Sequence, residues 1–213
     1  MQLFNRSSTV RTPKTGARTP HGIQFLLTRG VKTKANGGGS VIAFTSANPR
    51  AGVSHVVRSL AAQLAAQTHE PTVIVEAERL ASLQVGDLID LRARCARTNI
   101  PNLWVLRKPA SLNGNGHKHG LESDATGEID CLRALRSTFK HTLIDCPSIN
   151  DSHEAPLLAP KVDGVVLVVE ADRTRRNQIL HARQTIELAD GKLLALVLNK
   201  RRHLVPEWLY RML

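Results

Sequence analysis

Eight consecutive residues carry the groups that commonly bind phosphate. They read Ala47-Asn48-Pro49-Arg50-Ala51-Gly52-Val53-Ser54. In the pattern G-x-x-x-x-G-K-[ST], backbone N–H groups cradle the phosphates, the lysine contacts the β- and γ-phosphates, and the hydroxyl binds Mg²⁺. This chain keeps the second glycine and the hydroxyl, whereas alanine replaces the first glycine and valine replaces the lysine. The segment therefore predicts a phosphate-binding loop without its usual cation.

The valine predicts a larger loss in phosphoryl transfer than in nucleotide binding. Backbone N–H groups at a helix N-terminus bind anions whatever the side chains are. A hydrogen bond to a charged group contributes about 1.5–3 kcal/mol, and electrostatic stabilisation is usually the largest part of phosphoryl-transfer catalysis. Arg50, three residues before Val53, is a candidate to replace the missing charge.

The sequence around the loop predicts alternating strands and helices. Residues 41–44 form a continuous apolar run, as in a strand buried on both faces, and apolar residues recur at helical spacing from Val56 onward. The same patterns predict strands at 72–75, 103–106, 141–145, 164–169 and 193–198, and helices at 80–98, 128–139, 174–189 and 207–213. This order predicts an α/β fold, a doubly wound, mostly parallel sheet with helices on both faces.

Polar residues end several of these strands, namely Ser46, Glu76, Asp145 and Asn199. Ligands of doubly wound sheets bind at the carboxyl ends of the strands, so these side chains are expected near one site. Asp145 closes an apolar strand, where a carboxylate can hold the coordination shell of Mg²⁺. Together with Gly52 and Ser54, it predicts a magnesium–nucleotide site.

Charge is unevenly distributed along the 213 residues. The chain has 29 Lys and Arg against 18 Asp and Glu, a net charge of +11, and no acidic residue before Glu70. We expect residues 1–39 to be a basic, largely disordered segment with a short docking helix within 22–32, and residues 40–213 to form the folded domain. The basic segment favours nucleic acid, an anionic membrane surface or an acidic partner, and the alternative is a solvated tail.

The three cysteines, 95, 131 and 146, are scattered without metal-ligand spacing, which favours a reducing compartment. No uninterrupted apolar run approaches the length that crosses a bilayer. These features predict a cytoplasmic protein.

Five segments together resemble bacterial tyrosine kinases of exopolysaccharide and capsule systems, relatives of the MinD/ParA class of P-loop ATPases. They are the loop at 47–54, Val75-Glu76-Ala77-Glu78, Leu143-Ile144-Asp145-Cys146-Pro147, residues 162–169 and Leu196-Val197-Leu198-Asn199-Lys200. The resemblance covers about residues 22–213 in the same order. It implies a P-loop NTPase-like domain that binds ATP or ADP with Mg²⁺ at the inner membrane face. The partners it implies are a membrane-embedded polysaccharide copolymerase or adaptor and further copies of the chain.

The resemblance also assigns roles to individual residues. It makes Asp145 and Glu76 catalytic, and it makes Ser54, Asp145 and Glu78 the Mg²⁺ ligands. Nucleotide contacts fall to residues 47–54, from Ala47 and Asn48 through Pro49, Arg50, Ala51, Gly52 and Val53 to Ser54, and to Asn199, whose counterpart contacts the adenine edge.

This chain departs from the family where the chemistry is done. The family's loop resembles S-A-x-P-G-E-G-K-S, so Arg50, Ala51 and Val53 differ, and Glu76-x-Glu78 replaces its D-x-D. A longer carboxylate displaces the base by about one methylene, a distance that matters for catalytic positioning. The family's tyrosine-rich tail is missing, because Tyr210 is the only tyrosine, and its oligomerisation motif is reduced to Arg29.

Three functional hypotheses follow. The first is a kinase-like protein with a degenerate phosphate loop that serves as a cytoplasmic partner or regulator in exopolysaccharide or capsule synthesis and export. The second is an active ATPase or tyrosine kinase in which Arg50, or an arginine from a neighbouring subunit, supplies the missing charge. The third is a ParA/MinD-like positioning protein that binds DNA or membrane through its basic N-terminal segment.

Overall fold

The computed structural model describes residues 38–80, 83, 91–107 and 125–200. The predicted docking helix within 22–32 and the predicted helix at 207–213 lie outside these residues, as does most of the basic N-terminal segment. Within the described residues, no helix combines the length and apolarity that crossing a bilayer requires.

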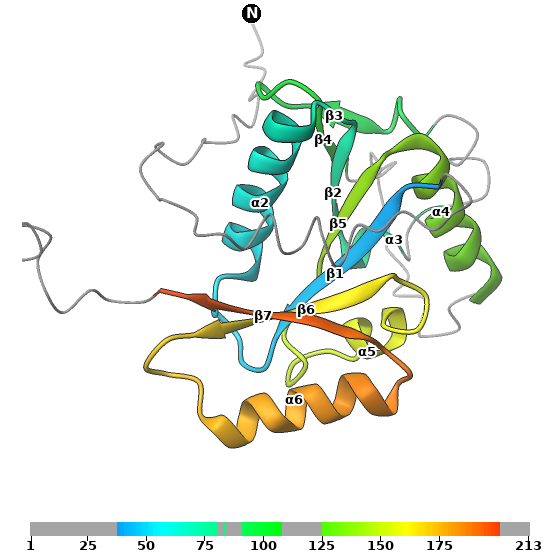
Figure 1. Cartoon of the computed structure of the whole chain (residues 1–213). Coiled ribbons are helices and arrows are strands. Elements are labelled where there is room, and N and C mark those ends of the chain that lie inside the picture. The colour runs from blue at the N-terminus through cyan, green and yellow to red at the C-terminus, as the bar shows by residue number, and fades with distance from the viewer. Residues whose placement is uncertain (1–37, 81–82, 84–90, 108–124, 201–213) are drawn as a thin grey trace, which may run out of the picture.

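The described residues form a seven-stranded sheet with the order β3-β4-β2-β5-β1-β6-β7 (Figure 1). The strands are β1 (Ser40–Ser46), β2 (Thr72–Glu76), β3 (Cys95–Arg97), β4 (Leu103–Leu106), β5 (His141–Asp145), β6 (Gly164–Glu170) and β7 (Leu193–Asn199). All neighbouring strands pair in parallel except β3, which runs antiparallel to β4. This confirms the predicted doubly wound, mostly parallel sheet.

Helices cover both faces of the sheet. They are α2 (Val53–Thr68), α3 (Ala77–Leu80), α4 (Ala125–Thr138), α5 (Glu154–Leu158) and α6 (Arg176–Leu188). Figure 1 shows α2 and α4 on opposite sides of the central strands. Because successive side chains of a strand point to opposite faces, each central strand contributes to two separate cores.

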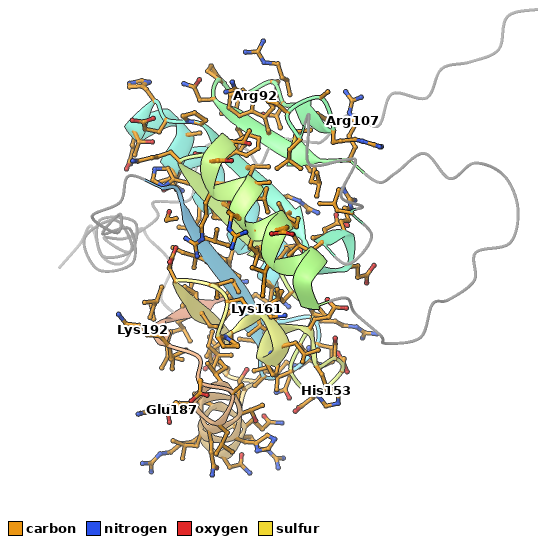
Figure 2. All side chains as sticks on the ribbon, turned by 90° about the vertical axis from the view of Figure 1, so that its right-hand side faces the viewer. Arg92, Arg107, His153, Lys161, Glu187 and Lys192 are labelled. Carbon is orange, nitrogen blue, oxygen red and sulfur yellow. The ribbon has the colours of Figure 1, made fainter. Side chains whose placement is uncertain are left out.

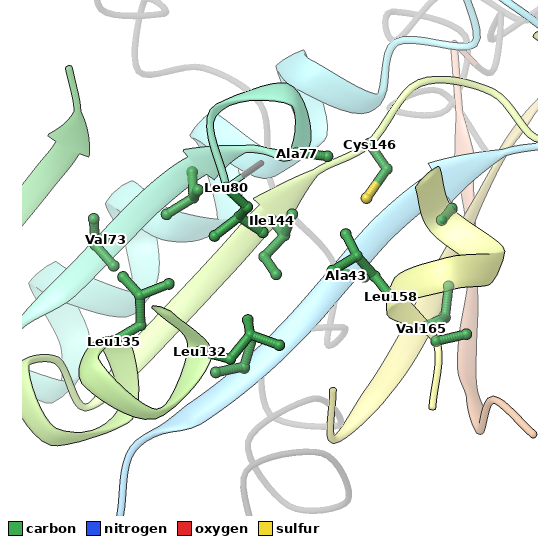
Figure 3. Packing of buried hydrophobic residues seen from close by; sticks show 14 of the residues in the cluster. Ala43, Val73, Ala77, Leu80, Leu132, Leu135, Ile144, Cys146, Leu158 and Val165 are labelled. Atoms are coloured by element: carbon green, nitrogen blue, oxygen red, sulfur yellow. The ribbon is translucent and has the colours of Figure 1, made fainter. Parts of the chain in front are cut away.

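The core beneath α2 contains alternate strand residues such as Ile42, Phe44 and Val166. The opposite core contains the intervening residues, such as Ala43 and Val165, packed against α4, α5 and α6. Figure 3 shows part of this second core, in which side chains of α4 and α5 contact β1, β5 and β6. Strands that are buried on both faces explain the continuous apolar runs in the sequence.

The predicted helix at 80–98 is wrong in its described parts. Helix α3 ends at Leu80, and residues 95–97 form β3. The apolar spacing was helical, but pairing of Cys95 with Leu106 in the neighbouring strand decides the conformation. Helix α4 begins at Ala125, three residues before its predicted start, and α6 begins at Arg176 rather than at 174. Strand β3 and helix α5 were not predicted.

Candidate functional site

The loop that joins β1 to α2 lies at the carboxyl edge of the sheet. Strand β5 pairs with β1, and Phe44 is in register with Asp145, so the strand-ending carboxylate lies beside the start of the loop. A cavity of about 430 Å³ opens there. Its walls include residues 49–54 of the loop, Arg58, Glu76, Glu78, Asp145 and Asp151.

Side chains from the end of β7 hold the second half of the loop from outside. Asn199 Nδ2 donates to the carbonyl of Ala51 at 2.9 Å, and Lys200 Nζ donates to the carbonyl of Arg50 at 2.5 Å. In a planar trans peptide, the carbonyl and the following N–H point in opposite directions. The N–H groups of Ala51 and Gly52 are therefore directed away from these side chains, as an anion-binding loop requires.

Two features of the structure favour glycine at position 52 over any residue with a Cβ. Its φ is +90°, a conformation that L-residues rarely adopt, and it caps the N-terminus of α2. A Cβ at this position would lie 2.4 Å from Asn199 Nδ2. The glycine that the sequence retained from the phosphate-binding pattern is thus needed for the loop's backbone and for its contact with β7.

Asn48 fixes the first half of the loop. Its carbonyl accepts a hydrogen bond from the Ser46 hydroxyl at 2.7 Å. Its side-chain amide exchanges two hydrogen bonds with Gln178 of α6, at 2.9 and 3.1 Å, and its oxygen also accepts one from Asn150 at 3.0 Å. Three segments far apart in the sequence are therefore joined at Asn48.

Asp145 and Ser54 meet at the end of the cavity nearest α2. Burial raises the pKa of the Asp145 carboxyl above its ordinary value, whereas a hydrogen bond with Ser54 and the charge of Arg58 lower it. Mg²⁺ is usually bound by one or two carboxylates together with water and phosphate oxygens. A hydroxyl in contact with a partly buried carboxylate fits that donor set.

The two glutamates lie on the neighbouring side of the cavity. Glu76 is in register with Asp145 across β2 and β5 and forms a 2.7 Å ion pair with Arg79. Glu78 faces Glu154 of α5, and burial together with the charge of Glu78 raises the pKa of Glu154. Across the described residues, no three or more His, Cys, Asp or Glu side chains converge as a metal site would require. A cation here would depend on the ligand's own oxygens as well.

Most of the residues proposed from the sequence lie around this cavity. Residues 49–54, Glu76, Glu78 and Asp145 line it, whereas Ala47 is buried beneath the loop. Asn48 and Asn199 hold the loop through the hydrogen bonds above. Val53 is only 8% exposed and belongs to the apolar core under α2, so its side chain offers no polar contact.

Sequence reasoning missed Arg58, Asp151 and Gln178. Arg58 and Asp151 line the cavity, and Asp151 accepts a 2.6 Å hydrogen bond from the Ser148 hydroxyl. Arg58 had a usable signal, because it follows Ser54 by four residues and so shares its helix face. Gln178 had none, since only the tertiary fold brings α6 to the loop.

Comparisons with known proteins support the fold described above. No family model matches the chain. The tyrosine-protein kinase CpsD of Streptococcus agalactiae is 27% identical over 182 residues, which cover 75% of this chain and 75% of CpsD. The solved kinase domain of VpsO is 21% identical with a TM-score of 0.65, over 85% of this chain and 92% of that one. MinD from Pyrococcus horikoshii, solved with Mg-ADP, is 15% identical with a TM-score of 0.55, over 82% and 77%.

Proposed function

Because this chain belongs with the bacterial tyrosine kinases of the MinD/ParA class of P-loop ATPases, we propose that it binds a magnesium–adenine nucleotide at residues 49–54. We further propose that it acts in exopolysaccharide or capsule synthesis as a kinase-like protein with reduced phosphoryl transfer. The observation that carries this proposal is Val53, an apolar residue in a loop whose carbonyls at Arg50 and Ala51 are held by side chains from the end of β7.

Each part of the cavity has a role in this proposal. The N–H groups at the start of α2 bind the phosphates, since they are unpaired at any helix N-terminus. Ser54 and Asp145 hold the Mg²⁺, with Glu78 acting through water. The metal would neutralise charge on the phosphate oxygens. Glu76, across from Asp145, is the candidate to accept a proton from an attacking hydroxyl.

Isothermal titration calorimetry tests nucleotide binding. We expect ATP and ADP to bind in the presence of Mg²⁺ and to bind more weakly after chelation, because the carboxylates that line the cavity would then repel the phosphates. Asp145→Asn should remove most of the magnesium dependence. No heat of binding at millimolar nucleotide would contradict the proposal, and turnover equal to that of an intact kinase would contradict its claim of reduced catalysis.

The cellular part of the proposal concerns location and partner. Such a chain would work at the cytoplasmic face of the inner membrane, recruited by a membrane-embedded polysaccharide copolymerase or adaptor. The tyrosine-protein kinases among its relatives support this role. Co-purification with the copolymerase encoded nearest to the chain's gene, before and after detergent extraction, would test it.

A second candidate function is binding to an anionic polymer or membrane, and the β3–β4 hairpin favours it. Arg92 and Arg97 lie over the Trp104 ring, at 5.1 and 5.7 Å from its centre, and Arg107 follows β4. Figure 2 shows Arg92 and Arg107 projecting at this end of the molecule. The ion pairs among the described residues involve other basic side chains. The three guanidinium groups of this hairpin could thus contact phosphates.

A further inference from the structure

Arg58 lies one helical turn beyond Ser54 on α2. Residues four apart in a helix share a face, and helical side chains tilt toward the N-terminus. Arg58 accordingly reaches back along α2 and lines the same cavity as Ser54 and Asp145. The opposite face of α2 packs on the apolar core, in which Val56, Val57 and Leu60 are buried.

Most charged side chains around the cavity are acidic, so binding of a phosphate ligand there requires a cation. Four carboxylates line it, those of Glu76, Glu78, Asp145 and Asp151, against the guanidinium groups of Arg50 and Arg58. A polyphosphate would add further negative charge to this set, and Val53 contributes no opposing charge.

Of the two arginines that line the cavity, Arg58 is the better placed to contact phosphates bound at Ser54 and the N-terminus of α2. It shares a face of α2 with Ser54, whose hydroxyl is hydrogen-bonded to the Asp145 carboxylate in the same cavity. The ion pairs of the described residues leave Arg58 without a carboxylate partner. Arg50 lies in the part of the loop that β7 holds, since its carbonyl accepts a hydrogen bond from Lys200.

We propose that Arg58 is the phosphate-contacting cation of this cavity, in place of the lysine that residue 53 lacks, and that it selects ligands carrying two or three linked phosphates. This inference rests on the proposed function and deepens it. Arginine is charged at any physiological pH and presents its N–H groups as a planar fork that matches two phosphate oxygens. The charge has moved from the loop to the first turns of the helix while remaining in the same cavity.

Calorimetric titration of the full chain and its Arg58→Gln variant with Mg-ADP, Mg-ATP and AMP tests this inference. We expect the variant to bind ADP and ATP at least tenfold more weakly, the loss that about 1.5–3 kcal/mol per charged hydrogen bond implies, with little change for AMP. Arg58→Lys should recover part of the loss. Arg183→Gln is the matched control, because Arg183 is an exposed arginine of α6 paired with Glu187.

The outcomes separate this inference from the proposed function. If the wild-type chain binds no nucleotide, the proposed function fails and the inference fails with it. If the wild-type chain binds but Arg58→Gln binds equally well, only the role of Arg58 is overturned. Loss of binding in Arg50→Gln and not in Arg58→Gln would likewise overturn it, in favour of Arg50.

Discussion

At the scale of single residues, burial makes ionisation of the Asp145 carboxyl costly, and the hydrogen bond with Ser54 offsets only part of this cost. Burial raises the pKa of its carboxyl above the ordinary 3.8. The folded chain therefore holds this proton more tightly than the unfolded chain, so ionisation above the folded pKa lowers the free energy of unfolding. A carboxylate whose ionisation lowers the stability of the unliganded protein is typical of binding and catalytic sites.

Asp145→Asn should consequently raise the midpoint of thermal unfolding at pH 7, because asparagine has no ionised form whose burial is costly. The gain should shrink as the pH falls toward 3.8, the ordinary value for aspartate, because both folded and unfolded wild-type chains then become protonated. Differential scanning calorimetry across this range measures the effect. Asp130→Asn, at an exposed residue paired with Arg133, should show no such gain, and a variant less stable than wild type at pH 7 would contradict the account.

Gly52 is the other residue for which the site dictates the amino acid. Gly52→Ala should lower the free energy of unfolding by about 1–3 kcal/mol, the usual cost of forcing a residue into a sparsely populated backbone region. It should also displace Asn199, whose amide would lie 2.4 Å from the new Cβ. Urea unfolding measures the cost, and Gly38→Ala is the control, since a Cβ there meets nothing within 4 Å. Equal stabilities of the two variants would refute this explanation.

At the scale of elements, α6 supports a loop that is 130 residues away in the sequence. The paired amides of Gln178 and Asn48 make two hydrogen bonds, and Gln178 also accepts a 2.9 Å bond from the backbone N–H of Arg175 at the start of α6. A loop held in its binding conformation before the ligand arrives loses less entropy on binding.

Gln178→Ala should therefore weaken nucleotide binding about fivefold, which corresponds to about 1 kcal/mol for a typical hydrogen bond. Calorimetric titration with Mg-ADP measures it. Gln184→Ala is the matched control, because Gln184 is an exposed glutamine on the same helix. The same affinity in both variants would show that α6 does not position the loop.

The sequence predicts the elements around the site well, for a physical reason. The central strands are buried on both faces, so apolar runs such as 41–44 and 164–169 mark them without any knowledge of their neighbours. Strand β3 is different, because three residues form a strand only by pairing with β4. Helix α5 has five residues and a proline in its interior, too short for a helical pattern to emerge.

The site was predictable to a similar degree. The loop, Asp145 and the two glutamates follow from their positions at strand ends, and they line one cavity. The contacts of Asn48 with Gln178 and Asn150 span 130 and 102 residues, so local sequence patterns carry no trace of them. The structure does not explain why Glu76 and Glu78 replace the aspartates of the family.

At the scale of the whole molecule, positive charge gathers at the β3–β4 hairpin, away from the largely acidic cavity. The net charge is +11, and the β3–β4 hairpin contributes Arg92, Arg97 and Arg107. Neutralising these three residues to glutamine should weaken binding to nonspecific duplex DNA. The slope of log affinity against log salt should fall by about 2–3, since each phosphate contact contributes about 0.9.

The control for that experiment has the same net charge. Arg133, Arg173 and Arg183 are exposed arginines that already form ion pairs with neighbouring carboxylates, and their triple glutamine variant should retain DNA binding. Fluorescence anisotropy over a salt series compares the two, with anionic vesicles as a second ligand. Equal loss in both triple variants would mean that total charge matters and the hairpin does not.

We propose, for the molecule as a whole, that the chain kept a nucleotide cavity and lost the lysine that makes such a cavity efficient. The most direct test is the turnover of Mg-ATP at saturating nucleotide by the wild-type chain, Val53→Lys and Val53→Met, where methionine supplies comparable length without charge. We predict at least a tenfold gain for lysine alone, the effect of about 1.4 kcal/mol on a barrier. Wild-type turnover that already equals that of the lysine variant would contradict the central claim.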